Sequence, residues 1–215
     1  MGEAVVAALG IALSPFAVIP AVLLLFTRRP GPTSASFGGG WYVGIAVVTA
    51  AAVLLADLLS LPDTPPAWLS WTRIALGLVL VLFGAYKLIK RDDDAPPPAW
   101  LTSLETATPP SALRFGLMAS APNPKVALLA IAGGFSLGAE ITGGAAAEVA
   151  AVLLFALLAS ATALLPVLVY AVLGENALGP LGRGKDWLTA RIGPIVSVVL
   201  VVIGAAVAYK GWSSL

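Results

Sequence analysis

The sequence contains no cysteine and no histidine. Without cysteine the chain has no disulfide, no thiolate nucleophile and no ligand for soft metals. Without histidine it lacks the commonest metal ligand and the usual proton carrier near neutral pH. A nucleotide-binding loop is also missing, so this chain does not hydrolyse ATP. The usual nucleophile–base arrangements are therefore excluded, and we expect a protein that is not an enzyme and has no cofactor or metal.

Charged residues are scarce, at 11% of the chain, against 59% hydrophobic residues and a mean hydropathy of +0.97. No soluble domain has this composition, so the chain is a polytopic membrane protein. Membrane spans use nearly all of its 215 residues, which leaves no room for a second globular domain. The start, Met1–Glu3, is not the basic region of a signal peptide, and we expect the first apolar run to be retained as a span.

The apolar runs predict an all-α fold with six transmembrane helices. Loops of small residues are predicted at Arg28–Gly40 and Gly174–Lys185. The segment 91–112 is charged and rich in proline, which favours an extended or partly disordered cytoplasmic loop. The predicted spans are Ala4–Thr27, Trp41–Leu61, Trp68–Ile89, Leu113–Leu137, Ala145–Leu173 and Arg191–Tyr209.

Basic residues are distributed unevenly over the loops. One side of the predicted bundle holds only Arg73 and Lys210. The positive-inside rule therefore predicts a multi-pass protein of the cytoplasmic (inner) membrane with both termini outside. The basic residues near the loops after the first, third and fifth spans are Arg28, Arg29, Lys87, Lys90, Arg91, Arg114, Arg183, Lys185 and Arg191.

The fourth predicted span contains a broken stretch at its middle. Pro122 and Pro124 lack N–H groups, and Asn123 stands between them. Lys125 follows directly, near the bilayer centre, where an ionisable group costs at least about 2.5–3.5 kcal/mol. Broken backbone at membrane depth is tolerated where it is buried in protein or lines a watery cavity. The stretch is therefore a candidate functional site.

The first predicted span resembles the fourth. In each, a glycine stands four residues before a serine, at Gly10–Ser14 and Gly116–Ser120, and prolines follow. The similarity predicts two repeats, 1–90 and 113–215, and three spans per repeat require inverted topology. Interrupted helices at matching positions of such repeats indicate a midplane binding site. The alternative is that the prolines only kink the helices and the small residues only help them to pack.

A buried ammonium at the midplane needs an anionic partner, and the first, fourth and sixth spans contain no acid in their cores. A phosphate, sulfate or carboxylate of the substrate would supply that charge, helped by helix N-termini that begin after each break. We therefore predict a substrate-binding site formed by Ser14, Pro15, Asn123, Pro124 and Lys125.

Structural roles are the alternatives for several of these residues. Lys125 could pair with Asp57, or could be neutral because burial disfavours the charged form. Asp57 and Arg73 both lie near the outer interface, as a structural ion pair or as an outer gate. Mid-span hydroxyls are expected to make helix-packing hydrogen bonds; they belong to Thr49, Ser160 and Thr162.

The chain resembles the lysine-exporter (LysE) superfamily. The resemblance rests on six spans with proline-broken spans 1 and 4, and on Asn123-Pro124-Lys125. Leu13-Ser14-Pro15 and the proline-rich central loop look most like its GAP family, the peptidoglycolipid- and sulfolipid-addressing (Sap) proteins. That resemblance implies movement of an anionic glycolipid of the cell envelope. Cation transport is disfavoured, because spans 1 and 4 contain no acidic residue to supply oxygen ligands.

We therefore predict a flippase-like transporter of an anionic lipid-linked or glycolipid substrate, which requires a lateral opening between spans. An exporter of a small hydrophilic solute such as an amino acid would instead need an enclosed cavity. A non-transporting scaffold for envelope lipid assembly and an integral-membrane transferase are further alternatives. The expected partners are the lipid bilayer and the lipid substrate, and no nucleic acid. Gly40–Gly44 has the small-xxx-small spacing that permits a homodimer.

Overall fold

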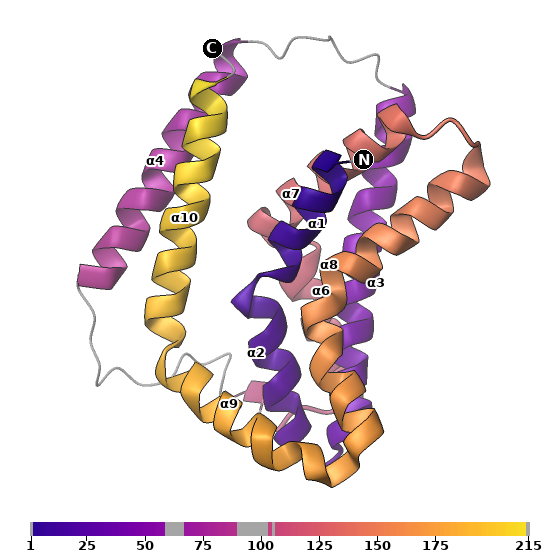
Figure 1. Cartoon of the computed structure of the whole chain (residues 1–215), viewed down its shortest axis with the longest axis vertical. Coiled ribbons are helices and arrows are strands. Elements are labelled where there is room, and N and C mark those ends of the chain that lie inside the picture. The colour runs from indigo at the N-terminus through magenta and orange to yellow at the C-terminus, as the bar shows by residue number, and fades with distance from the viewer. Residues whose placement is uncertain (1, 59–66, 90–102, 105, 214–215) are drawn as a thin grey trace. The chain divides into compact units, whose positions relative to one another are not determined.

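The computed structural model describes residues 2–58, 67–89, 103–104 and 106–213 (Figure 1). Within these residues the fold consists of α-helices and short 3-10 helices, without a strand, as the composition predicts. The chain divides into two compact units, residues 1–60 with 97–185 and residues 61–96 with 186–215. The first unit contains both proline-broken segments and therefore the candidate site.

The helices of the first unit pack around α3, the long helix Pro30–Leu58, which contacts α6, α7 and α8. The first broken segment packs against α8, and its first half also contacts α7. The bounds of the other elements in this unit are α1 Gly2–Ala12, α2 Pro15–Leu23, η1 Leu24–Phe26, α6 Pro109–Ser120, α7 Pro124–Glu140, α8 Ala145–Leu173 and η2 Gly174–Ala177.

The predicted loop at Arg28–Gly40 is wrong, because α3 already begins at Pro30. Proline is tolerated in the first turn of a helix, where its missing N–H would have no intrahelical partner. The glycines that suggested a loop are contact positions. Gly40 lies against the Leu113 backbone and Gly44 against Ser120, so closely that a Cβ at either position would overlap α6. The Gly40–Gly44 spacing is therefore used within the chain, and the homodimer stays a prediction without this support.

The glycine contacts also fix the direction of the helices. Gly40 and Gly44 of α3 face α6, whereas Thr49 and Ala52 face Gly134 of α7. Residue numbers rise together along both partners, so α3 runs parallel to the α6–α7 segment. The α1–α2 segment precedes α3 through a tight turn and runs the opposite way (Figure 1), with the Ser34 hydroxyl donating a hydrogen bond to the Ala21 carbonyl at 2.8 Å.

In the second unit, α4 (Ala67–Ile89) packs along α10 (Ile192–Trp212). The two helices approach most closely at Gly77 and Gly204, where a methyl group on Gly77 would lie 2.5 Å from the Gly204 carbonyl oxygen. The small residues thus let two backbones touch, as is common for helices in membranes. The bounds of these helices lie close to those of the predicted third and sixth spans.

The predicted Gly-rich loop at Gly174–Lys185 is also wrong. The 3-10 helix η2 follows α8 directly, and α9 spans Leu178–Ala190. Gly174 has a positive φ of 56°, which ends α8 without the steric cost that a side chain would add. The remaining glycines of this stretch stand inside a helix, where they are tolerated although they favour other conformations.

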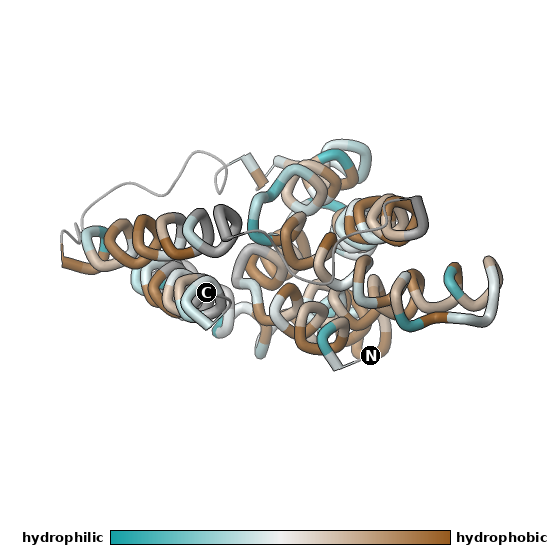
Figure 2. The backbone as a smooth tube through the Cα atoms, turned by 90° about the horizontal axis from the view of Figure 1, so that it is seen from above, coloured by the Kyte–Doolittle hydropathy of each residue, from teal (hydrophilic) through white to brown (hydrophobic). Residues whose placement is uncertain are grey.

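Hydrophobic residues occupy most of the length of the helices (Figure 2). Among the described residues, two helices are long and apolar enough to cross a membrane, Pro30–Ala56 and Ala145–Gly184. Two bent pairs add a further span each if each pair is counted as one. The fold is thus an all-helical membrane protein with two to four candidate spans. The predicted loop 91–112 lies outside the described residues up to 102, and α6 begins at Pro109, inside its predicted range.

Candidate functional site

The first break interrupts the α1–α2 segment at Leu13 and Ser14. The two halves are bent by 43°, and Ser14 is extended (φ −81°, ψ 125°) and 1% exposed. Pro15 is the first residue of α2 and offers no N–H to the preceding turn. The Ile11 carbonyl instead accepts from the backbone N–H of Ser14 at 3.0 Å. The break is therefore locally built by the Ser14-Pro15 pair, as the sequence predicts.

A neighbouring helix donates a hydrogen bond to a backbone carbonyl of this break. The Thr162 hydroxyl of α8 donates a hydrogen bond to the Ala12 carbonyl oxygen, the last residue of α1. This contact joins residues 150 positions apart and confirms the predicted helix-packing role of Thr162. It is the arrangement that interrupted backbone needs at membrane depth, where water is not available as a partner.

Replacing Thr162 by valine should lower the free energy of unfolding by about 1 kcal/mol, since hydrogen bonds between membrane helices contribute about that much. Thr162→Ser keeps the hydroxyl and should restore most of the loss. The measurement is equilibrium unfolding in bicelles, followed by tryptophan fluorescence. Equal stability of wild type and Thr162→Val would show that the Ala12 carbonyl does not depend on this donor.

The second break interrupts the α6–α7 segment at Ala121–Asn123, with a bend of 68°. Asn123 is the N-cap of α7, and its side-chain oxygen accepts from the backbone N–H of Lys125 at 3.1 Å. Its own N–H donates to the Ser120 carbonyl at 3.2 Å. The Ser120 hydroxyl donates back to the Gly116 carbonyl at 2.8 Å. Both breaks thus consist of a polar cap residue followed by proline at the start of a helix.

Lys125 lies at the middle of this broken segment, sixteen residues after the first residue of α6 and fifteen before the last residue of α7. Its side chain is half-buried. Among the described residues no acidic group forms an ion pair with it. The helix bounds therefore place Lys125 at the middle of the broken segment, and its ammonium lacks an acidic partner within the described part of the chain.

The alternative pairing of Lys125 with Asp57 does not fit the register of the helices. Gly138 of α7 lies against Ala56 of α3, directly before Asp57. Lys125 precedes Gly138 by thirteen residues, which places it about 20 Å away along the helix. Two side chains do not bridge that distance. The side chains of Asp57 in α3 and Arg73 in α4 lie outside the described residues, so the outer gate or ion pair stays a prediction.

The two breaks come to the same level of the first unit. Gly10 of α1 faces Leu129 of α7, and a Cβ on Gly10 would lie 3.2 Å from the Leu129 side chain. Ser14 follows Gly10 by one helical turn, and Lys125 precedes Leu129 by one turn. Because the two segments run in opposite directions, these equal offsets place Ser14 and Lys125 at a similar level along the helix axes. The structure thus assembles the predicted residues at one level from both halves of the chain.

Several buried polar atoms of the first unit lack a hydrogen-bond partner among the described residues. The hydroxyls of Thr49 and Ser160 are fully buried and have no hydrogen-bond partner in the described structure, in contrast to their predicted role in helix packing. The indole N–H of Trp41 is also buried and has no hydrogen-bond partner among the described residues. Unpartnered buried polar atoms are uncommon and call for a water or a ligand. Sequence reasoning missed Trp41, because its burial depends on the contact of α3 with Gly116, which the sequence does not reveal.

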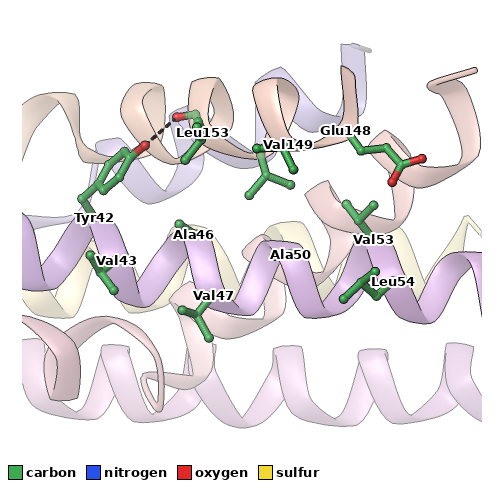
Figure 3. Close-up of a pocket in the computed structure, with 11 residues that line it drawn as sticks. Tyr42, Val43, Ala46, Val47, Ala50, Val53, Leu54, Glu148, Val149 and Leu153 are labelled. Atoms are coloured by element: carbon green, nitrogen blue, oxygen red, sulfur yellow. Dashed lines mark hydrogen bonds between the residues drawn. The ribbon is translucent and has the colours of Figure 1, made fainter. Parts of the chain in front are cut away.

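A lateral groove of about 420 Å³ lies between α3 and α8 (Figure 3). Tyr42 closes one end, because its hydroxyl donates a hydrogen bond to the Leu153 carbonyl at 3.3 Å, and Glu148 stands at the other end (Figure 3). Between these ends the lining is aliphatic, and Ala46 and Ala50 leave room because their side chains are small. Val47 is 60% exposed, so the groove opens to the side of the helix pair.

A family model described as Sap, sulfolipid-1-addressing protein, matches residues 4–213. The chain belongs to this family. The match covers both broken segments and confirms the Sap resemblance that Leu13-Ser14-Pro15 and the proline-rich central loop indicated. It does not extend to the LysE superfamily, which stays a prediction. No curated protein and no solved structure matches the chain.

Proposed function

We propose that this Sap-family protein moves an anionic lipid-linked or glycolipid substrate across the cytoplasmic membrane. The observation that carries the proposal is Lys125, an ammonium at the middle of a broken span without an acidic partner in the described structure. A charge at that depth is costly unless something compensates for it. The sulfate, phosphate or carboxylate of a lipid headgroup would compensate for it during passage. The family description, which names a sulfolipid, agrees with an anionic headgroup.

The broken helices would complete the anion site. α2 begins after Ser14 and α7 after Asn123, and helix N-termini carry exposed N–H groups and positive partial charge. The Asn123 oxygen is occupied by the cap hydrogen bond, whereas its amide nitrogen has no partner among the described residues and can donate to a ligand. Ser14, Asn123 and Lys125 thus supply hydrogen-bond donors and positive charge, and Pro15 and Pro124 are the first residues of the two helices.

The packing supports a proposed architecture of six spans in two inverted repeats. The α1–α2 segment is the first span of the first proposed repeat. It packs on α8, which is the second span of the second repeat. Reciprocally, α6–α7 packs on α3, and the third members α4 and α10 pack on one another. The broken segments run in opposite directions, as inverted topology requires. The proposed orientation places both termini outside the cytoplasmic membrane, following the basic loops.

The lateral groove between α3 and α8 favours a lipid over a small hydrophilic solute. A soluble metabolite needs an enclosed polar cavity, whereas a lipid enters and leaves from the side. The groove is open and aliphatic, with Glu148 as its one charged residue. An exporter of amino acids and a non-transporting scaffold remain the alternatives that experiments must separate from lipid translocation.

Substitution of Asn123 separates capping from substrate recognition. Aspartate caps helices as well as asparagine does, so Asn123→Asp should leave stability within about 0.5 kcal/mol of wild type. It replaces an amide donor by a negative charge beside Lys125 and should slow transfer of an anionic lipid at least about tenfold. Asn123→Ala should lose about 1 kcal/mol of stability with the cap and, because it adds no repelling charge, should slow transfer less than Asn123→Asp does.

The measurement is leaflet transfer of a fluorescent lipid with a sulfated headgroup in proteoliposomes, with the protein's unfolding free energy measured in parallel. A neutral lipid with the same chains serves as the control substrate. Undiminished transfer of the sulfated lipid by Asn123→Asp would overturn the anion site at this break. Efflux of an entrapped amino acid without lipid transfer would favour the small-solute exporter.

A further inference from the structure

The groove between α3 and α8 is long and chemically asymmetric. Its lining on α3 extends from Tyr42 to Leu54, twelve residues or about 18 Å. Half the hydrocarbon core of a bilayer is about 15 Å thick, so this length corresponds to one leaflet. One end is closed by the Tyr42–Leu153 hydrogen bond and is apolar otherwise. The opposite end holds the carboxyl group of Glu148 (Figure 3).

The ends of the groove lie at different depths. Tyr42 is two residues from the midpoint of α3, at Gly44, the position that faces the second break. Glu148 stands in the first turn of α8, eleven residues or about 16 Å from the midpoint of that helix. In the six-span architecture proposed above, the groove therefore runs from near the bilayer middle on α3 to the edge of the hydrocarbon core, and its lining on α8, Glu148–Leu153, covers only the outer part of that length. In the orientation proposed above, that edge belongs to the outer leaflet.

We propose that this groove binds one acyl chain of an outer-leaflet lipid, whose headgroup hydroxyl donates a hydrogen bond to Glu148. The inference rests on the proposed orientation and lipid-translocation function, and it adds a second site to the break at Lys125. An aliphatic channel one leaflet long, with a single hydrogen-bond acceptor at its interfacial end, matches the polarity of a lipid from tail to headgroup. A carboxyl group at that end favours headgroups with hydroxyl donors, such as sugars, over phosphate or sulfate.

The groove is narrow for a helix as its occupant. A helix is about 10 Å across, whereas the groove of about 420 Å³ lies between two helices that are joined by the Tyr42–Leu153 hydrogen bond. A second copy of the chain would therefore rest on the rim of the groove without filling it. A single acyl chain is narrow enough to enter between the helices and contact the floor at Ala46 and Ala50.

Two adjacent alanines of α3 provide a matched test. Ala50 lines the groove, whereas Ala51 is exposed on α3 and does not line it. The full-length protein is placed in nanodiscs that contain a glycosyl diacylglycerol with a diazirine in the middle of one acyl chain. After irradiation, cross-linked peptides are identified by mass spectrometry. Wild type should be labelled on both α3 and α8 at groove residues.

Ala50→Trp fills the groove and should reduce this labelling at least about tenfold, since losing contact with two methylene groups costs that much affinity. Ala51→Trp should leave labelling unchanged. Equal labelling of both variants, or label spread evenly over exposed faces such as Leu154, would overturn the site. Cross-linking of groove residues to a second copy of the chain would show that a dimer partner covers the groove and would overturn the lipid site. Thermal unfolding of both variants shows whether either has lost its fold, and Val47→Trp then provides a second blocking variant.

The headgroup arm uses Glu148→Leu, which removes the acceptor and keeps an apolar side chain. Wild type should prefer the glycosyl diazirine lipid over phosphatidic acid with the same chains, and the substitution should reduce this preference about fivefold. An unchanged preference would overturn the hydrogen bond to Glu148. Groove labelling together with normal transfer by Lys125→Ala would leave this inference standing while the proposed anion site fails. Loss of transfer in Lys125→Ala without groove labelling would leave the proposed anion site standing while the groove inference fails.

Discussion

Lys125→Ala should reduce leaflet transfer of a sulfated lipid by about 10- to 100-fold in proteoliposomes, because a hydrogen bond to a charged group contributes about 1.5–3 kcal/mol. Lys125→Arg should retain much of the activity, since it keeps the positive charge at the same position. The effect should appear in the transfer rate and not in folding. Lys125 has no ionic partner among the described residues, so its removal leaves no acid unpaired.

The matched control is Lys87→Ala, because Lys87 is an exposed lysine of α4 whose ammonium lies over the Phe83 ring at 5.5 Å. Its loss should leave transfer unchanged. Transfer is followed by chemical quenching of a fluorescent headgroup in the outer leaflet. Equal reductions in both variants would indicate a general effect of positive charge, and an unaffected Lys125→Ala protein would remove Lys125 from the mechanism.

Gly40→Ala should cause the largest loss of stability among single-methyl additions, about 1–3 kcal/mol. A Cβ at this position would lie inside 3.0 Å of the Leu113 carbonyl oxygen, which belongs to backbone and cannot rotate away. The two helices must therefore separate, and α3 would lose its contact with the first half of the broken segment. Because that contact sets the position of Ser120 beside Gly44, the second break should shift with it.

The adjacent residue, Gly39, provides a control for which the expected change in stability has the opposite sign. A Cβ added to Gly39 would meet no heavy atom within 4 Å, so Gly39→Ala encounters no obstacle. It should stabilise the protein by up to about 1 kcal/mol, since alanine is the better helix former. Equilibrium unfolding of both variants in bicelles checks the pair. A stabilised Gly40→Ala protein would contradict the close packing of α3 on α6.

Local chemistry made the helices and the breaks predictable. The fifth predicted span, Ala145–Leu173, has the bounds of α8, and the third differs from α4 by one residue at its start. Both interruptions fall where proline removes a backbone donor, at Ser14-Pro15 and Asn123-Pro124. These features depend on a few neighbouring residues, so a single sequence contains the information.

Features that depend on distant partners were missed. Gly40 is equally compatible with a loop and with a close helix contact, and only α6, some seventy residues later, shows that it is a contact position. A helix-packing role was predicted for Thr162, but the identity of its partner, the Ala12 carbonyl, follows from backbone positions that the sequence does not specify. The groove between α3 and α8 is a property of shape, set by Tyr42 and two alanines.

The most direct test of the central claim is a leaflet-resolved profile of envelope lipids in a deletion strain that carries either the wild-type chain or Lys125→Ala. If the protein translocates an anionic lipid through the site at Lys125, one anionic lipid-linked species should be retained on the inner side in the deletion strain and in the Lys125→Ala strain. The wild-type chain should restore it to the outer side. An identical leaflet distribution of every anionic lipid in all three strains would contradict the account.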